Sequence, residues 1–358
     1  MFRNEMCVSN KIMLTLVFFL IATGLSPLVR AQDNKTIDTQ RAFLKVLSPS
    51  VKRILYEPSA FSGPGIPIPY SDRGYLIARR IESFASDTPN VMLYGKDGKK
   101  VREAAIWFPE SIRVAITSAA VTPDGRIVAS GEADKADGTR AGFIALTDLT
   151  GKITRVIQTT DFYPTNVCVA PDNTVWSFGA TWWDNVNHRP LPGDLLRHFD
   201  FGKGQLAGYI PRSTFPDHSS YDNSTQIRCS AEEVAILSRP ENTYILVSYE
   251  NEVPRIYDAS SPVGISLVGF GILGQSKAYA VLINRERSDD PTQGLYSLEL
   301  DETAKAVRWS PVQGAVGPRT GPATVIRLWG TDREYLVLSR SQDPAGTTAL
   351  HWASISEK

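Results

Sequence analysis

The sequence predicts an all-β fold, a β-propeller of six four-stranded blades closed by the N-terminal strand. Three observations predict it: a hairpin pattern that recurs six times, a second hairpin pattern after most copies, and a lack of helical periodicity. The clearest copy of the first pattern is AAVTPDGRIVAS at residues 119–130. Pro123, Asp124 and Gly125 favour a tight turn between its two apolar runs, which can then pair only as an antiparallel hairpin.

The first pattern places six hairpin turns along the chain, with starts separated by 35 to 68 residues. The average spacing of about 50 residues is typical of propeller repeats. Each of the first five turns is followed by another pair of apolar runs around a Gly- or Asp-bearing turn. We therefore expect four antiparallel strands, A to D, in each repeat. The six A–B turns are predicted at residues 71–74, 123–126, 171–174, 239–242, 274–277 and 330–333.

The two ends of the chain predict how the ring closes. The last repeat has a candidate C strand at residues 348–355, but the sequence then ends at Lys358 without a D strand. The segment 42–57 is strand-like and belongs to no repeat. We expect it to complete the last blade, which would tie the termini together and remove an open sheet edge. One propeller domain over residues 32–358 follows.

The N-terminal residues 1–31 have the pattern of a signal peptide. Arg3 and Lys11 precede an apolar run from Ile12 to about Ala22, and Val29 and Ala31 supply the small residues expected before a cleavage point. The alternative is an uncleaved anchor, because the apolar span approaches the length needed to cross a bilayer. We expect cleavage after Ala31 and a secreted or periplasmic protein with no membrane span in its mature form.

Charge and cysteine content narrow the choice of partners. The chain has 38 basic and 38 acidic residues, a balance that argues against a nucleic-acid partner. We expect a monomer. Two cysteines, Cys168 and Cys229, remain after cleavage at Ala31. They would be able to form a disulfide in an oxidising compartment. A chain of this size does not need a disulfide for stability, so we favour two separate buried thiols.

Loop lengths predict which face of the disc carries function. In a blade of antiparallel strands, the A–B and C–D turns lie on one face, and the B–C and D–A connections lie on the other. The predicted B–C connections are long, as is one D–A connection, and binding residues usually lie on loops held by a rigid scaffold. The long B–C connections are residues 132–140, 180–194, 284–293 and 340–347, and the long D–A connection is 211–224.

The third repeat has the richest pair of loops on this face. Carboxylate and imidazole groups there would be able to hold a divalent metal such as calcium or to exchange protons. Exposed tryptophan would stack on a sugar or another flat ligand. In the opposing interpretation the tryptophans cap the blade edge and the histidines are solvated loop residues. The candidate binding residues are Trp182, Trp183, Asp184 and His188 in the B–C loop, and Asp217, His218 and Tyr221 in the D–A loop.

No local catalytic motif accompanies these loops: the sequence has no P-loop, HExxH, GxSxG or dinucleotide fingerprint. Our leading hypothesis is therefore a binding scaffold for a small molecule, glycan or protein partner. The alternative is a metal-dependent lyase or hydrolase that uses Asp184, His188, Asp217 and His218 as ligands or bases. Asp134 and Asp137 add oxygen atoms on the same face, where Asp137-Gly138 is an ordinary turn signal.

Two hairpins resemble a known group of propellers. Residues 119–130 and 167–178, AAVTPDGRIVAS and VCVAPDNTVWSF, resemble the inner hairpins of secreted bacterial six-bladed propellers of the NHL-repeat, gluconolactonase-like and streptogramin-lyase-like kinds. The resemblance covers about a quarter of the chain and implies a fold rather than an activity. The metal-binding and catalytic residues of those families match no motif here, so none is carried over.

Overall fold

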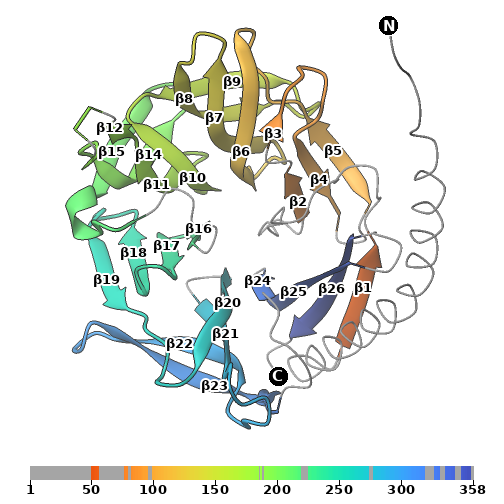
Figure 1. The fold of residues 1–358 in the computed structure, drawn as a ribbon, viewed down its shortest axis with the longest axis vertical. Coiled ribbons are helices and arrows are strands. Elements are labelled where there is room, and N and C mark those ends of the chain that lie inside the picture. The colour runs from red at the N-terminus through yellow and green to blue at the C-terminus, as the bar shows by residue number, and fades with distance from the viewer. Residues whose placement is uncertain are drawn as a thin grey trace, which may run out of the picture.

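The computed structural model describes residues 50–55, 76–79, 82–95, 99–184, 186–187, 189–218, 225–273, 277–318, 326–330, 335–342 and 348–355. Its strands form blades arranged in a ring, so the predicted β-propeller is confirmed (Figure 1). The signal-peptide prediction for residues 1–31 lies outside the described residues. Among those described, no helix is long and apolar enough to cross a membrane.

The described strands can be grouped into six blades, a number consistent with the prediction, although the fourth and fifth groups share one eight-stranded sheet. The first contains β2 (Leu76–Arg79), β4 (Val91–Tyr94) and β5 (Lys100–Ala104). The second contains β6 (Ser111–Val121), β7 (Ile127–Lys135), β8 (Arg140–Thr147) and β9 (Ile153–Thr159), and the short β3 (Glu82–Ser83) pairs with β6. The third contains β10 (Phe162–Val169), β11 (Val175–Thr181), β14 (Asp194–Asp200) and β15 (Gly204–Pro211). A small hairpin of β12 (Trp183–Asp184) and β13 (Arg189–Pro190) joins β11 to β14, and the 3-10 helix η2 (Arg212–Thr214) follows β15.

The remaining blades complete the ring. The fourth contains β16 (Thr225–Cys229), β17 (Glu233–Ser238), β18 (Thr243–Ser248) and β19 (Pro254–Asp258). The fifth contains β20 (Ser266–Leu273), β21 (Lys277–Ile283), β22 (Gly294–Asp301) and β23 (Ala306–Val316). The sixth contains β24 (Ile326–Gly330), β25 (Tyr335–Gln342), β26 (Thr348–Ile355) and β1 (Ser50–Leu55).

The sixth blade shows how the ring closes. Strand β1 pairs antiparallel with β26 over its whole length, from Ser50 opposite Ser354 to Leu55 opposite Ala349. The outermost strand of the last blade therefore comes from the N-terminal side of the chain, as the sequence predicts. The described strand is shorter than the predicted segment 42–57, whose other residues lie outside the described part.

Turn chemistry explains why the hairpins form where they do. In the second blade, the Thr122 amide donates to the Arg126 carbonyl at 2.9 Å, and Gly125 adopts a φ of 87°, a conformation that glycine takes without a Cβ clash. In the third blade Asn173 occupies the corresponding position with a φ of 68°, while the Thr174 amide donates to Asp172 at 2.9 Å. Both turns match the predicted positions.

The fourth blade corrects one prediction. The turn at residues 239–242 joins β17 to β18, so it is a B–C connection and not an A–B turn. The true A–B turn is at residues 230–232, between β16 and β17. Strand β16 has the sequence TQIRC, with a polar middle that does not look like a buried strand. With this correction, the uneven spacings of 68 and 35 residues become 59 and 44.

Apolar layers between neighbouring blades make up the core. Leu93 of the first blade and Ile106, which follows its last strand, pack against Ile116 and Phe143 of the second blade. Trp176 and Phe178 of the third blade join Val234 and Ile245 of the fourth in another cluster. The sheets of the second, third and fourth blades are thus covered on both faces, which explains the continuous apolar runs of inner strands such as β11 and β18.

A disulfide links the third and fourth blades at their innermost strands. Cys168 on β10 bonds to Cys229 on β16, with their Cα atoms 5.5 Å apart. The prediction of two separate thiols is therefore wrong. The two cysteines lie 61 residues apart in sequence, and only the side-by-side placement of innermost strands brings them within bridging distance.

Candidate functional site

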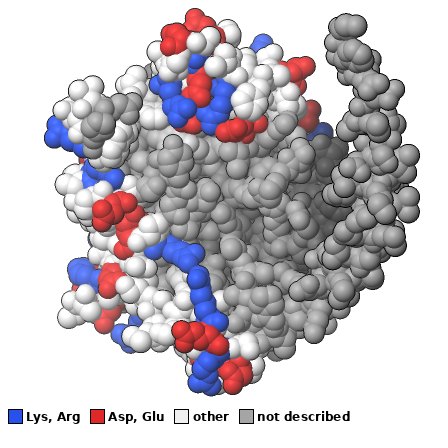
Figure 2. All heavy atoms as spheres, viewed as in Figure 1, with Lys and Arg blue, Asp and Glu red and all other residues white. Residues whose placement is uncertain are grey.

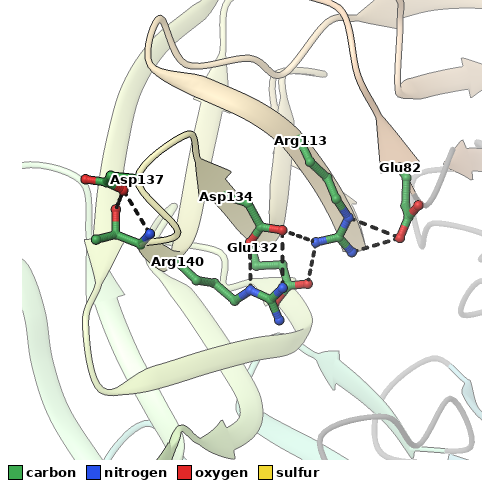
Figure 3. Close-up of polar contacts among 7 residues, drawn as sticks. Glu82, Arg113, Glu132, Asp134, Asp137 and Arg140 are labelled. Carbon is green, nitrogen blue, oxygen red and sulfur yellow. Dashed lines mark hydrogen bonds and ion pairs between the residues drawn. The ribbon is translucent and has the colours of Figure 1, made fainter.

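Ionic side chains gather on the B–C and D–A side of the second blade. Figure 2 shows acidic and basic residues alternating over this blade, and Figure 3 shows five of them in contact. Arg113 on β6 contacts Glu82 at 2.8 Å, Glu132 at 3.0 Å and Asp134 at 2.8 Å. Arg140 on β8 contacts Asp134 at 2.6 Å and Glu132 at 3.5 Å. We call these five residues the Arg113 cluster.

Strand register explains why the Arg113 cluster forms. Arg113 lies directly opposite Asp134, and Asp134 lies directly opposite Arg140, so opposite charges alternate across β6, β7 and β8. Glu132 is two residues before Asp134 and shares its side of β7. The pairing of β3 with β6 brings in Glu82 from the first blade's B–C connection.

This arrangement corrects the predicted long loop at residues 132–140. Strands β7 and β8 extend through most of it, and the connection is only residues 136–139, where the Lys135 amide donates to the Thr139 carbonyl at 2.8 Å. Asp134 is therefore a strand residue. Asp137 accepts hydrogen bonds from the amide and hydroxyl of Thr139 at 2.8 and 2.6 Å, in agreement with its interpretation as a turn residue.

Burial and charge make the Arg113 cluster self-contained. The Glu132 side chain is only 6% exposed and is neutralised by both arginines. Burial acts to raise the pKa of Asp134, but hydrogen bonds from Arg140 and Arg113 outweigh it and hold the pKa below its usual range. Burial likewise opposes the charge of Arg113, yet its hydrogen bonds to three carboxylates raise its pKa. The cluster therefore holds strands together, and each of its charged side chains contacts an opposite charge, with three carboxylates sharing two arginines.

A cavity of about 360 Å³ lies beside the Arg113 cluster. One wall is the D–A connection that leaves the first blade, and the other is the face of the second blade's sheet that packs toward the first. Strand ends of β7 and β8 and the outermost strand β9 form that second wall. The lining residues are Phe108, Pro109, Glu110, Ser111, Ala133, Lys135, Thr139, Arg140, Ala141, Gly142, Phe143, Val156 and Gln158. We call this space the blade 1–2 cavity.

The interior of the blade 1–2 cavity is mostly apolar and its mouth is polar. Phe108 and Phe143 lie edge to face, with ring centroids 4.9 Å apart. Small side chains at Ala133 and Ala141, opposite each other in register, leave the space open. At the mouth Lys135 contacts Glu110 at 2.5 Å, and this contact raises the pKa of Lys135. Its size and its few polar groups are typical of small-molecule sites.

The predicted tryptophan loop forms the β12–β13 hairpin. Trp183 is 55% exposed, whereas the Trp182 ring packs against Tyr163 with centroids 5.3 Å apart. Asp184 is used by its own turn: it accepts hydrogen bonds from the amides of Val186 and Asn187 and from the Asn187 side chain. These bonds hold the pKa of Asp184 below its usual range, and the bond from the Asn187 side chain has the largest effect. Of the three residues, Trp183 alone is well placed to meet a ligand.

The two described candidate residues of the predicted D–A loop differ in exposure. Asp217 is exposed, but His218 is buried, with Nδ1 2.7 Å from a carboxylate oxygen of Glu241. The other Glu241 oxygen accepts a hydrogen bond from Ser238, and the His218 ring lies edge-on to Phe178. Burial acts to raise the pKa of Glu241, but His218 and Ser238 outweigh it and lower the pKa. His218 is therefore buried and paired, and is not a solvated loop residue.

No group of three or more His, Cys, Asp or Glu side chains able to hold a metal occurs among the described residues. The candidate ligands Asp184, Asp217 and His218 do not form such a group. His188 and Tyr221 lie outside the described residues. His198 stacks on Trp176 with ring centroids 4.2 Å apart.

Sequence reasoning missed Glu241 and all of the blade 1–2 cavity. Glu241 lies in a turn that was assigned to the wrong pair of strands. The cavity is lined by residues from four strands and two connections, each unremarkable alone. The acidic residues Glu132 and Asp134, two positions apart, and Arg140 after the turn indicate a cross-strand ion cluster if both strands extend to the end of the hairpin.

Comparisons with known proteins support no closer identity. No protein-family model matches the chain, and no curated protein matches it. Among solved structures it is similar to U3-55K, with 7% identity and a TM-score of 0.46 over 85% of this chain and 98% of the other. It is also similar to the β-propeller domain of Myceliophthora thermophila Swd1, with 10% identity and a TM-score of 0.42 over 84% and 99%. A Bacteroides fragilis protein described as exported, BF0058, matches with 9% identity and a TM-score of 0.49 over 86% and 95%.

Proposed function

We propose that this protein is an exported binding scaffold, a propeller that holds its ligand or partner on the face carrying the B–C and D–A connections. The observation that carries the proposal is the blade 1–2 cavity, which lies between the D–A connection at residues 108–110 and the B–C hairpin around residues 136–139. Such a cavity on a rigid repeat scaffold is the ordinary location of a binding site.

Export rests on two independent features. Residues 1–31 have the order of charge, apolar run and small residues that a secretion signal needs. The Cys168–Cys229 disulfide adds to this, because such bonds persist in oxidising compartments and are rare in reducing ones. We propose that the mature domain begins at Gln32 and acts as a monomer.

The metal-dependent lyase or hydrolase receives no support from a specific observation. That mechanism requires side chains from the third-blade loops to converge within about 2–2.6 Å of one ion. Asp184 is committed to its own turn and His218 to Glu241, so in the described residues the set does not form. Binding of a small molecule is the better-supported activity.

Mapping with small organic probes tests the proposed face. Crystals or labelled samples of residues 32–358 are exposed to a panel of small alcohols, ketones and phenols, and the positions where several probes overlap are recorded. We expect overlap on the B–C and D–A face, with the blade 1–2 cavity among the positions. Overlap confined to the opposite face would contradict the proposal.

A reporter fusion tests export separately. Residues 1–31 are joined to an alkaline phosphatase that is active only after export, beside a control in which Ile12–Ala22 is interrupted by two arginines. Activity from the first fusion alone is expected. Equal inactivity of both fusions in a bacterial host would contradict export.

A further inference from the structure

We propose that the blade 1–2 cavity binds a small uncharged aromatic molecule that carries one hydrogen-bonding group, such as a phenol. The inference rests on the proposed function and names the class of ligand for that site. Three properties of the cavity support it: the shape and chemistry of its walls, the pairing of every charge at its mouth, and a polar uncharged side chain beside one aromatic wall.

The walls favour a flat ring. The rings of Phe108 and Phe143 meet edge to face at an interplanar angle of 69°. The pair therefore offers a ligand both a ring edge and a ring face. A third aromatic ring placed against such a pair gains edge-to-face or offset contacts. Ala133 and Ala141 leave the opposing surface flat. An apolar cavity of about 150 Å³ suffices to hold benzene, so about 360 Å³ also accommodates a substituent.

The paired charges at the mouth disfavour a charged ligand. Lys135 is paired with Glu110 at 2.5 Å, and Arg140 is paired with Asp134 through two hydrogen bonds of 2.6 and 3.2 Å. A carboxylate or an ammonium that entered the apolar space would lose hydration without meeting an unpaired opposite charge, which is costly. The Lys135–Glu110 pair is exposed and adds little to this cost, so the main penalty is the lost hydration. An uncharged ring loses little hydration and leaves both pairs intact.

Gln158 supplies a partner for one polar substituent. It lies on β9 directly opposite Phe143 on β8, and it lines the cavity at its outer side. A primary amide has both donor and acceptor atoms, so it can bond a hydroxyl group in either direction. A ring packed against the Phe108–Phe143 pair would place a substituent near this amide, and a hydrogen bond to the amide would favour phenols over simple hydrocarbons.

Binding of four matched probes to residues 32–358 tests the ligand class by ligand-observed NMR titration. The probes are 4-methylphenol, its anionic analogue 4-hydroxyphenylacetate, its cationic analogue tyramine, and the non-aromatic 4-methylcyclohexanol. We expect 4-methylphenol to bind at least fivefold more tightly than each of the other three. Equal affinity for 4-methylcyclohexanol overturns the aromatic preference, and tighter binding of either charged probe overturns the uncharged class.

Two sets of variants locate the binding. Ala141→Leu fills the cavity and is expected to weaken 4-methylphenol at least tenfold. Val156→Ser and Leu206→Ser form a matched pair, since both residues lie on outermost strands and are 43% and 42% exposed, but Val156 alone lines the cavity. We expect Val156→Ser to weaken binding at least threefold and Leu206→Ser to leave it unchanged.

The possible failures can be told apart. If Ala141→Leu does not fold, as judged by its melting temperature, the Val156 and Leu206 pair decides. Unchanged binding in folded Ala141→Leu, or equal effects in the matched pair, overturns the site. If 4-methylphenol does not bind while other probes overlap on the B–C and D–A face, the ligand class fails and the proposed function stands. No probe binding on that face contradicts both.

Discussion

The loops of the third blade and the cavity of the second show two outcomes for polar residues on one face of a propeller. In the third blade, conspicuous residues are used locally: Asp184 ties its own turn, and His218 is buried against Glu241. In the second blade, residues with no distinctive motif form a charged cluster with a cavity beside it. A suggestive loop composition is thus weaker support for a site than a place where two blades leave space between them.

Removing the disulfide is expected to have the largest effect on stability, and we expect the third blade to be destabilised most. Replacing Cys168 and Cys229 with alanine opens a crosslink that spans 61 residues and encloses both third-blade loops. We expect the free energy of unfolding to fall by about 3–4 kcal/mol, measured by denaturant titration. Amide exchange should accelerate around His218 more than along β7 and β8. A loss below about 1 kcal/mol would show that blade packing alone holds the two inner strands.

Arg113→Met tests whether the Arg113 cluster holds the second blade together. Glu132, 6% exposed, would lose its closest partner, and a broken buried pair costs about 3–5 kcal/mol. Because Arg113 itself is 21% exposed and Arg140 remains, we expect the free energy of unfolding to fall by about 2–3 kcal/mol. The control Arg155→Met removes an exposed arginine whose side chain donates a hydrogen bond to the Phe201 carbonyl at 3.3 Å, and should change stability by less than about 0.5 kcal/mol.

The pH dependence of Arg113→Met follows from Asp134. Its pKa is lowered in the folded protein, so it contributes stability above the ordinary carboxyl pKa, and this is lost as the pH falls through the folded value. The difference in stability between wild type and Arg113→Met should therefore be full at pH 7 and shrink below about pH 4. A difference that grows on acidification would contradict the cluster's assigned role.

His218→Leu tests the buried pair in the third-blade loop. Glu241 would keep Ser238 but lose the histidine that offsets its burial, so its pKa should rise. We expect a loss of about 2 kcal/mol at pH 7. A raised pKa favours the folded state at low pH and costs stability as the pH rises, so the variant should recover toward wild type near pH 4. A loss that does not depend on pH would indicate that only packing against Phe178 matters.

The smallest effect is expected for Asp184→Asn in the β12–β13 hairpin. The side-chain amide can still accept hydrogen bonds through its oxygen, but the charge that strengthens them is lost. We expect faster exchange of the Val186 and Asn187 amides and an unchanged melting temperature. A clear fall in melting temperature would show that this turn supports the whole blade and is not an isolated loop.

Much of the fold was determined by the sequence itself. The turns at Gly125 and Asn173 and the apolar runs beside them are local signals, because φ preference and hairpin pairing depend on a few neighbouring residues. The unpaired last repeat predicted closure by an N-terminal strand, and β1 pairs with β26. The local signal failed at β16, where half-buried polar residues conceal a strand.

The candidate site and the crosslink were decided by tertiary structure. Nothing within the sequence around Cys168 points to Cys229, since only the ring places β10 beside β16. Phe108, Ala141 and Val156 line one cavity because strand register and the packing of neighbouring blades bring them together. His218, a candidate binding residue of the D–A loop, is instead buried against Glu241 of another turn. Turns are set by local backbone preferences, whereas cavities and buried pairs depend on how separate blades meet, which no short stretch of chain specifies.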